Sequence, residues 1–279
     1  MEKVYWDCPD FSLSQTLECG QCFRYQKEDN DCYTVISGQR VVTLGQAGGS
    51  IVFYGGEDIS FWKGYFDGER NYGEIKQQLS RNDPVMSEAI SFAPGIRILK
   101  QEFFEMLMSF ILSQNNHIPR IRGLIQRLCG EYGTYIGTGR YSFPTPEQLS
   151  GVSEEEYRRL GCGFRARYLA DAVEKVLAGG FRPEELDQLS TAELRQRLMS
   201  ICGVGQKVAD CILLFSFGRY EVFPMDVWIN RVYSHAYCSG KKLSLLELQK
   251  SAAENFGENA GFAQQYLFHY GRNMKIGKG

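Results

Sequence analysis

The chain has 279 residues, which is room for one large domain or two ordinary ones. With 43% hydrophobic and 13% aromatic residues it can bury substantial cores, but no apolar run is long enough to cross a bilayer, and we expect no membrane partner. The first ten residues carry acidic side chains and lack the apolar stretch of a secretory signal. We therefore expect an intracellular protein of the cytoplasm or nucleoid, and no nuclear targeting signal is visible.

The net charge of −2, taken as a sum, argues against a nucleic-acid-binding protein. The charges are unevenly distributed, because residues 1–93 contain 8 Lys and Arg against 14 Asp and Glu, whereas the remainder contains 23 against 19. The N-terminal part has a net charge of −6 and the remainder a net charge of +4, which is compatible with a DNA-binding groove in the C-terminal part. Most imbalances of this size are solvated surface, so charge alone does not decide the question.

Nine cysteines are scattered through the chain, and two of them form the stretch Cys-Gly-Gln-Cys at residues 19–22. Two thiols at this spacing are typical of a dithiol redox site or of half a zinc site. No second C-x-x-C pair completes a tetrahedral zinc site. We interpret Cys19 and Cys22 as small buried packing residues, and we expect no metal and no other cofactor.

The first part of the chain has the composition of β-strands. Val, Tyr, Phe, Thr and Ile recur in short runs, which Gly, Asn and Asp interrupt at turn spacing, and residues 28–33 resemble a hairpin loop. The predicted strands lie at residues 4–8, 22–26, 32–44 and 50–56.

From Asp58 onward the pattern is helical, with apolar residues recurring at three- and four-residue spacing. Pro119 suits the first turn of a helix, and Thr145 and Ser153 suit N-caps. The predicted helices cover residues 101–116, 117–133, 164–180, 226–237, 244–257 and 259–271, with two more within 190–218. The predicted fold class is α+β: an antiparallel β-rich domain over residues 1–95 and an all-helical region over residues 96–279.

The most specific stretch is LRQRLMSICGVGQKVADCILLF, which predicts a helix-hairpin-helix motif at about residues 193–216. Gly203 and Gly205 permit a tight turn and let a phosphodiester approach the main chain, so we expect Gly203, Val204, Gly205 and Gln206 to contact it. The second helix begins there, and its free N–H groups and positive dipole end bind phosphate without a charged side chain. An ordinary corner between two helices would show the same Gly-x-Gly.

Lys207 opens this second helix, where the helix dipole repels a cation and thereby favours the neutral, nucleophilic amine. The alternative is a surface lysine that contacts phosphate. Nineteen residues further on, Asp226 follows Pro224 at the start of another helix. It suits an N-cap, and it is also placed to act as a carboxylate partner of Lys207. The combination of G-V-G-x-K with P-x-D is much rarer than either part.

These residues resemble the eukaryotic Ogg type of 8-oxoguanine DNA glycosylase/AP lyase, within the helix-hairpin-helix–Gly/Pro–Asp superfamily. The likeness rests on GVGQKVADC and PMDVW and continues, in the family's order, through CGQCFRY, SQNNHIPRIRGLIQRLC, LGCGFRARY and GFAQQYLF. The resemblance implies that the β-rich domain is half of a TBP-like sheet and that the helical region is a glycosylase body. It implies a monomer that acts on double-stranded DNA containing 8-oxoguanine.

The resemblance also implies roles for individual residues. Lys207 would attack C1′ of the sugar and form a Schiff base, and Asp226 would stabilise the positive charge on the sugar. The Gly20 carbonyl would accept the N7 proton that distinguishes 8-oxoguanine from guanine. Cys211 and Phe268 would sandwich the flipped base, and Gln264 would bond its Watson–Crick edge.

On the opposite strand, the resemblance implies that Asn115 fills the vacated stack and that Arg120 and Arg165 bond the orphaned cytosine. Phe164 would be the wedge that kinks the duplex, at a position where the family often has Tyr. Trp228 stands where His is common, which puts a phosphate contact in doubt.

Three other functions remain open at this point. An alkylpurine glycosylase of the same superfamily usually has no lysine at this turn and relies on water attack. A non-catalytic helix-hairpin-helix module would use Lys207 only to bind phosphate. A thiol or zinc protein would depend on Cys19 and Cys22. The strictness of the opposite-base preference and the balance between the glycosylase and lyase steps are not encoded in any motif we identify.

Overall fold

The computed structural model describes residues 2–55, 58–238 and 243–274, and the chain divides into two compact units. Unit 1 consists of residues 1–22, 45–100 and 218–279, and unit 2 consists of residues 23–44 and 101–217. Each unit is therefore built from segments that are far apart in the sequence. Within the described ranges, no helix has both the length and the apolarity needed to span a membrane.

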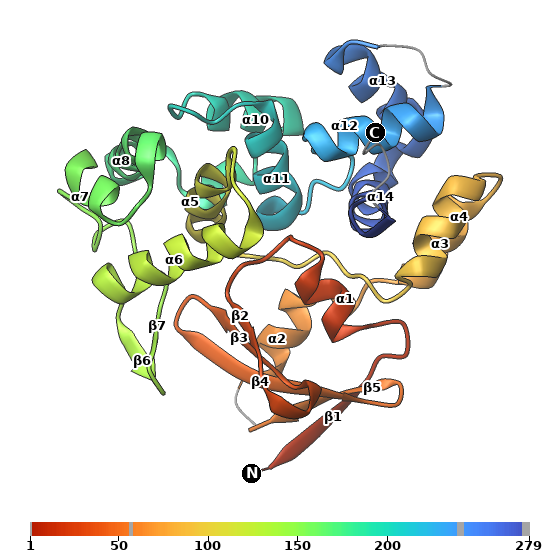
Figure 1. Cartoon of the computed structure of the whole chain (residues 1–279), viewed down its shortest axis with the longest axis horizontal. Coiled ribbons are helices and arrows are strands. Elements are labelled where there is room, and N and C mark those ends of the chain that lie inside the picture. Colours follow the sequence, from red (N-terminus) through yellow and green to blue (C-terminus); the bar gives the residue numbers. More distant parts are fainter. Residues whose placement is uncertain (1, 56–57, 239–242, 275–279) are drawn as a thin grey trace. The chain divides into compact units, whose positions relative to one another are not determined.

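The front of the chain forms the predicted antiparallel sheet, with strand order β1-β5-β4-β3-β2 (Figure 1). The hairpin predicted at residues 28–33 is confirmed, because Lys27 pairs with Tyr33 across it. A second tight turn joins Ser37 to Arg40 through Gly38, whose φ of 56° favours glycine. The strands are β1 (Lys3–Asp7), β2 (Tyr25–Lys27), β3 (Tyr33–Ser37), β4 (Arg40–Ala47) and β5 (Ser50–Tyr54).

Helices follow the sheet from residue 59 onward, as the helical pattern after Asp58 predicted, and one further helix lies within the sheet region (Figure 1). In unit 1 the helices are α1 (Leu13–Glu18), α2 (Ile59–Tyr65), α3 (Tyr72–Ser80), α4 (Pro84–Phe92), α12 (Val227–Tyr237), α13 (Leu245–Phe256) and α14 (Ala260–Met274). In unit 2 they are α5 (Phe103–Ser113), α6 (Ile118–Tyr132), α7 (Glu154–Arg159), α8 (Ala166–Lys175), α9 (Pro183–Leu186), α10 (Thr191–Met199) and α11 (Gln206–Phe217).

Two kinds of element have no counterpart in the sequence prediction. Helix α1 lies between β1 and β2 and has only six residues, begun by a Ser12 cap. The short strands β6 (Tyr135–Gly137) and β7 (Arg140–Tyr141) form a separate hairpin after α6. Elements this short carry too few residues for a periodic pattern, so tertiary packing decides them. The predicted N-cap of Ser153 is confirmed, and it forms a full capping box with Glu156.

Unit 1 has an aromatic core that encloses a buried arginine. Trp6, Phe11 and Phe66 lie in a chain of tilted ring contacts, with centroids 5.8 and 5.1 Å apart. The Arg97 guanidinium is 4.5 Å from the centre of the Tyr72 ring, and it donates to the Asp67 carbonyl. Cation–π contacts and main-chain acceptors thus compensate the buried charge.

Unit 2 is centred on α5, whose apolar stripe is buried as the sequence pattern predicts. Helix α11 packs against α5, and the Phe110 and Phe215 rings are stacked with centroids 5.7 Å apart. Burial of large apolar side chains on both helices, each contributing about 1.5–3 kcal/mol, holds the start of α11 in a defined place.

Candidate active site and nucleic-acid interface

The predicted site residues divide between the two units. Unit 2 carries the hairpin, the lysine, one of the base-stacking residues and the opposite-strand group: Gly203, Val204, Gly205, Gln206, Lys207, Cys211, Asn115, Arg120, Phe164 and Arg165. Unit 1 carries the aspartate and the remaining base-binding group: Asp226, Gly20, Gln264 and Phe268.

The predicted helix-hairpin-helix is present, formed by α10 and α11. Helix α10 begins at a Ser190 capping box with Glu193. Arg195 on α10 forms an ion pair with the buried Asp210 on α11, with Nε and Oδ1 2.6 Å apart. Burial raises the pKa of the Asp210 carboxyl, and the Arg195 guanidinium opposes this rise. The pair fixes the two helices of the hairpin to each other.

The two glycines of the turn serve different purposes. Gly203 has φ of 77°, and a Cβ there would lie 2.4 Å from the Tyr168 ring, so both conformation and space require glycine. At Gly205, by contrast, an added Cβ would meet nothing within 4 Å. Gly205 accepts the first main-chain bond of α11 from Ala209, so it occupies the N-cap position. An open face beside the free N–H groups of a helix start is a ready anion-binding surface.

Lys207 is the second residue of α11 and is half-buried. Its Nζ lies 5.2 Å from the centre of the Phe110 ring, within cation–π distance. Cys211 is buried one turn later, so both side chains point to the same side of α11. The amine is thus held over an aromatic ring, two residues after the open position at Gly205.

The opposite-strand residues gather around one turn of unit 2. Asn115 is exposed and adopts a left-handed conformation with φ of 46°. Arg165 is buried and donates to the carbonyls of Gln114, Asn115 and Cys162, with 2.9 Å between its Nη2 and the Asn115 oxygen. Main-chain acceptors therefore already engage its donors in this structure.

Two positive charges lie close together at this turn. Burial lowers the pKa of Arg165, and the neighbouring positive charge of Arg120 lowers it further. Arg120 is exposed, and its Nη2 donates to the Gly161 carbonyl at 3.5 Å. Phe164 is 51% exposed, with the Arg165 guanidinium 4.4 Å from its ring centre. A protruding aromatic ring beside two arginines is a suitable surface for stacked bases and their acceptors.

In unit 1, Asp226 is the N-cap of α12, as predicted. Its Oδ1 accepts a hydrogen bond of 2.8 Å from the Ile229 main-chain N–H. The side chain is half-buried, and the charge-assisted cap holds it in one orientation. Trp228, the departure from the family pattern, is the second residue of the same helix and is also half-buried.

Gly20 and Gln264 both have features that suit ligand recognition. Gly20 has φ of 93°, a conformation that strains any residue with a side chain. Gln264 is only 6% exposed, and its Oε1 has no hydrogen-bond partner among the residues the structure describes. A buried acceptor without a partner is costly, so the position is suited to a ligand donor. Phe268 lies one helical turn beyond Gln264 on α14.

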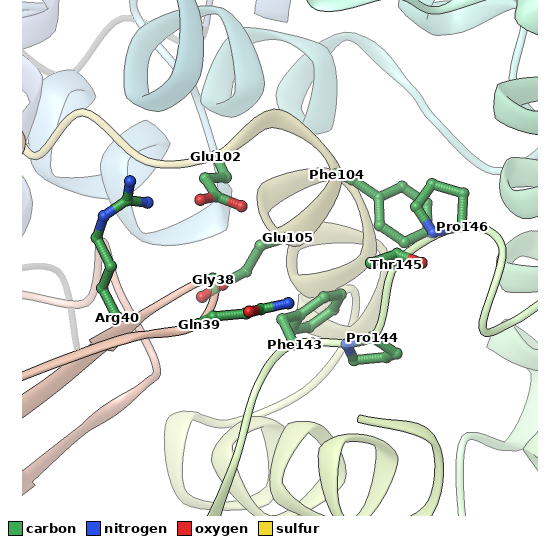
Figure 2. A pocket seen from close by; sticks show the side chains of 10 residues that line it. All are labelled: Gly38, Gln39, Arg40, Glu102, Phe104, Glu105, Phe143, Pro144, Thr145 and Pro146. Carbon is green, nitrogen blue, oxygen red and sulfur yellow. The ribbon is translucent and has the colours of Figure 1, made fainter. Parts of the chain in front are cut away.

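A hollow of about 510 Å³ in unit 2 lies next to the Gly38 turn and the start of α5 (Figure 2). Figure 2 shows Glu102 and Glu105 on the α5 side and Phe143 and Pro144 across from them. Burial raises the pKa of Glu105, and Arg24, 3.5 Å away, opposes this rise. None of the predicted site residues lines this hollow, so it is separate from the predicted chemistry.

Cys19 and Cys22 are both buried, as predicted for packing residues. Burial raises the pKa of Cys19, which disfavours the reactive thiolate of a redox dithiol. Over the described ranges, no group of three or more His, Cys, Asp and Glu side chains could hold a metal ion.

Sequence reasoning missed two contacts that organise the hairpin: the Phe110 ring beneath Lys207 and the Arg195–Asp210 pair. The signal for Phe110 was its place in an apolar stripe, which predicts burial but not its neighbour. Asp210 within an apolar helix face was a stronger signal, because a buried carboxylate needs a partner.

The hairpin, its glycine turn and the following aspartate define a class, the HhH-GPD superfamily of base excision DNA repair proteins, whose family description matches residues 108–257. Residues 4–107 match the N-terminal domain of 8-oxoguanine DNA glycosylase. The chain belongs to the 8-oxoguanine DNA glycosylase family and is a bifunctional N-glycosylase/DNA lyase.

Known relatives agree with this assignment. The chain is 33% identical to the N-glycosylase/DNA lyase OGG1 of Arabidopsis thaliana, over 93% of this chain and 77% of that protein. It is 45% identical to MBOgg1, solved with a low-affinity DNA ligand, with a TM-score of 0.93 over 98% of this chain and 96% of that one. It is 39% identical to the Clostridium acetobutylicum 8-oxoguanine glycosylase/lyase, solved with duplex DNA containing cytosine opposite 8-oxoguanine, with a TM-score of 0.91 over 96% and 94%.

Proposed function

We propose that this enzyme removes 8-oxoguanine from duplex DNA, preferably opposite cytosine, through a Schiff base on Lys207. The observation that carries the proposal is the half-buried Lys207 amine at the start of α11, over Phe110 and next to the open face of Gly205. Binding phosphate alone would not require a half-buried amine over an aromatic ring. We further propose that the enzyme acts as a monomer on the DNA of the cell.

In the proposed reaction, the lone pair of Lys207 Nζ attacks C1′ and the glycosidic electrons leave with the base, which takes up a proton. The amine loses its protons as the sugar ring opens, leaving an imine. Loss of a C2′ proton then expels the 3′ phosphate by β-elimination, and water hydrolyses the imine. Asp226 stabilises the positive charge that develops on the sugar.

The remaining residues are assigned to recognition. The Gly20 carbonyl accepts a hydrogen bond from the N7–H group of 8-oxoguanine, a group that guanine lacks. Gln264 bonds the Watson–Crick edge of the flipped base, which is sandwiched by Cys211 and Phe268. The unpartnered Gln264 Oε1 supports this role. On the other strand, Asn115 fills the space that the flipped base leaves in the stack, and Phe164 kinks the duplex. Arg120 and Arg165 bond the orphaned cytosine. Arg165 exchanges its main-chain partners for the base when DNA binds.

Borohydride trapping tests the proposal, because it reduces the imine to a stable amine. Wild-type enzyme should form a covalent complex with an 8-oxoguanine:cytosine duplex, and Lys207→Gln should lose trapping and lower excision by about 10⁴-fold or more. The matched control is Lys27→Gln, an exposed lysine in unit 2. Release of 3-methyladenine instead of 8-oxoguanine would indicate an alkylpurine glycosylase. DNA binding without release of either base would indicate a non-catalytic module.

A further inference from the structure

Helix α14 holds the turn at residues 18–21, here named the Gly20 turn, through two side chains. Gln265 Nε2 lies 3.0 Å from the Cys19 Sγ and 3.5 Å from the Cys19 carbonyl oxygen. Arg272 Nη2 donates to the Glu18 carbonyl at 2.9 Å. Gln265 and Arg272 are seven residues apart, so both lie on one stripe of α14. The helix therefore holds the two residues that directly precede Gly20.

The other side of the Gly20 turn is held from within the core. Gln21 is fully buried, and its Nε2 donates to the carbonyls of Thr16 at 3.0 Å and Arg97 at 2.7 Å. Its Oε1 accepts from the Leu99 N–H at 2.9 Å. The Cys19 thiol donates to the Thr16 carbonyl at 3.1 Å. Both neighbours of Gly20 are thus fixed by hydrogen bonds.

We propose that Gln265, Cys19 and Arg272 are positioning residues for recognition of the damaged base. Gln265 directly follows Gln264, and Cys19 directly precedes Gly20. The hydrogen-bonded bridge between Gln265 and Cys19 therefore connects the two main-chain segments that carry the recognition residues. The inference rests on the proposed function, which assigns Gly20 and Gln264 to the base. It changes the interpretation of Cys19, which is a hydrogen-bonding part of the turn as well as a packing residue.

The polar character of this bridge supports the proposal. Gln265 is 3% exposed and Cys19 is fully buried, so an apolar pair would fill the same space without the cost of burying an amide. A satisfied buried polar network, however, specifies one geometry more sharply than apolar packing does. A well-defined geometry matters here, because a single hydrogen bond to N7–H distinguishes damaged from normal guanine. A hydrogen bond weakens steeply as its geometry departs from the optimum.

Two activities of the same enzyme separate positioning from general structural support. Excision of 8-oxoguanine requires both the Gly20 carbonyl and Gln264 to meet the base. Cleavage at a preformed abasic site requires Lys207 but has no base to recognise. A side chain that only positions the recognition groups should therefore affect excision and leave abasic-site cleavage largely unchanged.

The test is Gln265→Met, which keeps the length of the side chain and removes the amide. We expect single-turnover excision of 8-oxoguanine to fall about tenfold, the effect of one hydrogen bond, and abasic-site cleavage to stay within about twofold. Cys19→Ala combined with Gln265→Met should lower excision by less than the product of the two single effects, because the two side chains share one hydrogen bond. Asn273→Ala is the control, since Asn273 is exposed and its Nδ2 donates to the His269 carbonyl of its own helix.

Equal loss of both activities, or loss of neither, would overturn the positioning role. Arg272→Met, at a half-exposed position, provides a second variant should Gln265→Met fail to fold, and the same selective loss of excision is expected. A wild-type enzyme that cleaves abasic sites without releasing 8-oxoguanine would refute the proposed substrate and this inference together. A wild-type enzyme that releases it, with variants that behave like wild type, would refute this inference alone.

Discussion

In unit 2 the polar residues of the predicted site include the donors of one lysine and two arginines, whereas in unit 1 they include a carboxylate and a buried amide oxygen, which are acceptors. Lys207 supplies an amine, Arg120 and Arg165 supply guanidinium groups, and Gly205 leaves the start of α11 open. In unit 1, Asp226 carries a carboxylate and Gln264 an unpartnered Oε1. Phosphates and the cytosine edge offer acceptors, and 8-oxoguanine offers N–H donors. On the proposed function, the arginines of unit 2 bond the cytosine edge, and Gln264 of unit 1 bonds the Watson–Crick edge of the damaged base.

The units also differ in how they hold these groups. Unit 2 positions its hairpin with an ion pair to the buried Asp210 and with apolar packing of α11 on α5. Unit 1 positions the Gly20 turn with hydrogen bonds from Gln21, Gln265 and Arg272. Contact with a DNA backbone tolerates adjustment, but discrimination by one hydrogen bond does not, and a hydrogen-bonded frame is the stiffer support.

After the loss of Lys207, the largest effect is expected at Asp226, the carboxylate of unit 1. Asp226→Asn should lower excision about 10²–10³-fold, or about 3–4 kcal/mol, because the carboxylate charge is lost from the transition state. The melting temperature should not change, since Asn is as good an N-cap as Asp. Asp226→Ala should lose the same activity and also about 1 kcal/mol of stability. Full activity of the Asp226→Asn variant would contradict the catalytic role and would show that Asp226 serves only as a helix cap.

The next effect tests the ion pair on which unit 2 relies. Arg195→Met should lower the free energy of unfolding by about 3 kcal/mol, because it leaves Asp210 charged and buried without a partner. Burial already raises the pKa of Asp210, so the folded state binds its proton more tightly than the unfolded state. Stability of the variant should therefore increase as pH falls through the folded-state pKa, and denaturant titrations at several pH values would measure this.

The double variant Arg195→Met, Asp210→Leu is the control for this experiment. It removes both charges, so it should recover most of the lost stability and show no such pH dependence. A single variant with wild-type stability at neutral pH would contradict the role given to the pair.

The two glycines of the hairpin allow a matched test of packing against binding. Gly203→Ala should cost about 2 kcal/mol of stability, because alanine is strained at φ of 77° and its Cβ would meet the Tyr168 ring. Gly205→Ala should cost less than about 1 kcal/mol and chiefly weaken DNA binding, since its Cβ would fill the open face. Thermal melts and titrations with duplex DNA would separate the two effects, and a reversed order would contradict our interpretation of the turn.

The smallest effect is expected at Phe164, which protrudes from unit 2 with half its surface exposed. Phe164→Ala should leave stability within about 0.5 kcal/mol of wild type and lower excision about tenfold, because the wedge is lost. Phe164→Tyr should retain activity, since the ring that stacks is kept. Excision measured on single-stranded substrate should be insensitive to both changes, because no duplex needs to be kinked there.

The sequence predicted the long elements and the position of Lys207 at the start of a helix well, for a common physical reason. Apolar periodicity placed α5, α6 and α11, and the Gly-x-Gly turn placed Lys207 and its hairpin, because these signals depend on neighbours within a few residues. Helix α1 was missed, although it leads directly into the Gly20 turn. Its six residues form a helix only because Leu13, Thr16 and Leu17 are buried against distant segments.

Local sequence alone determined that this chain has a β-rich front, a helix-hairpin-helix with an N-terminal lysine, and a capping aspartate, since propensity, periodicity and turn chemistry are local properties. Tertiary structure alone decided the partners of these residues. Phe110 lies under Lys207, Arg165 bonds the Asn115 carbonyl, and Gln265 bonds Cys19. These contacts join segments far apart in the chain, and only packing of the folded units selects which of many possible polar and aromatic partners meet.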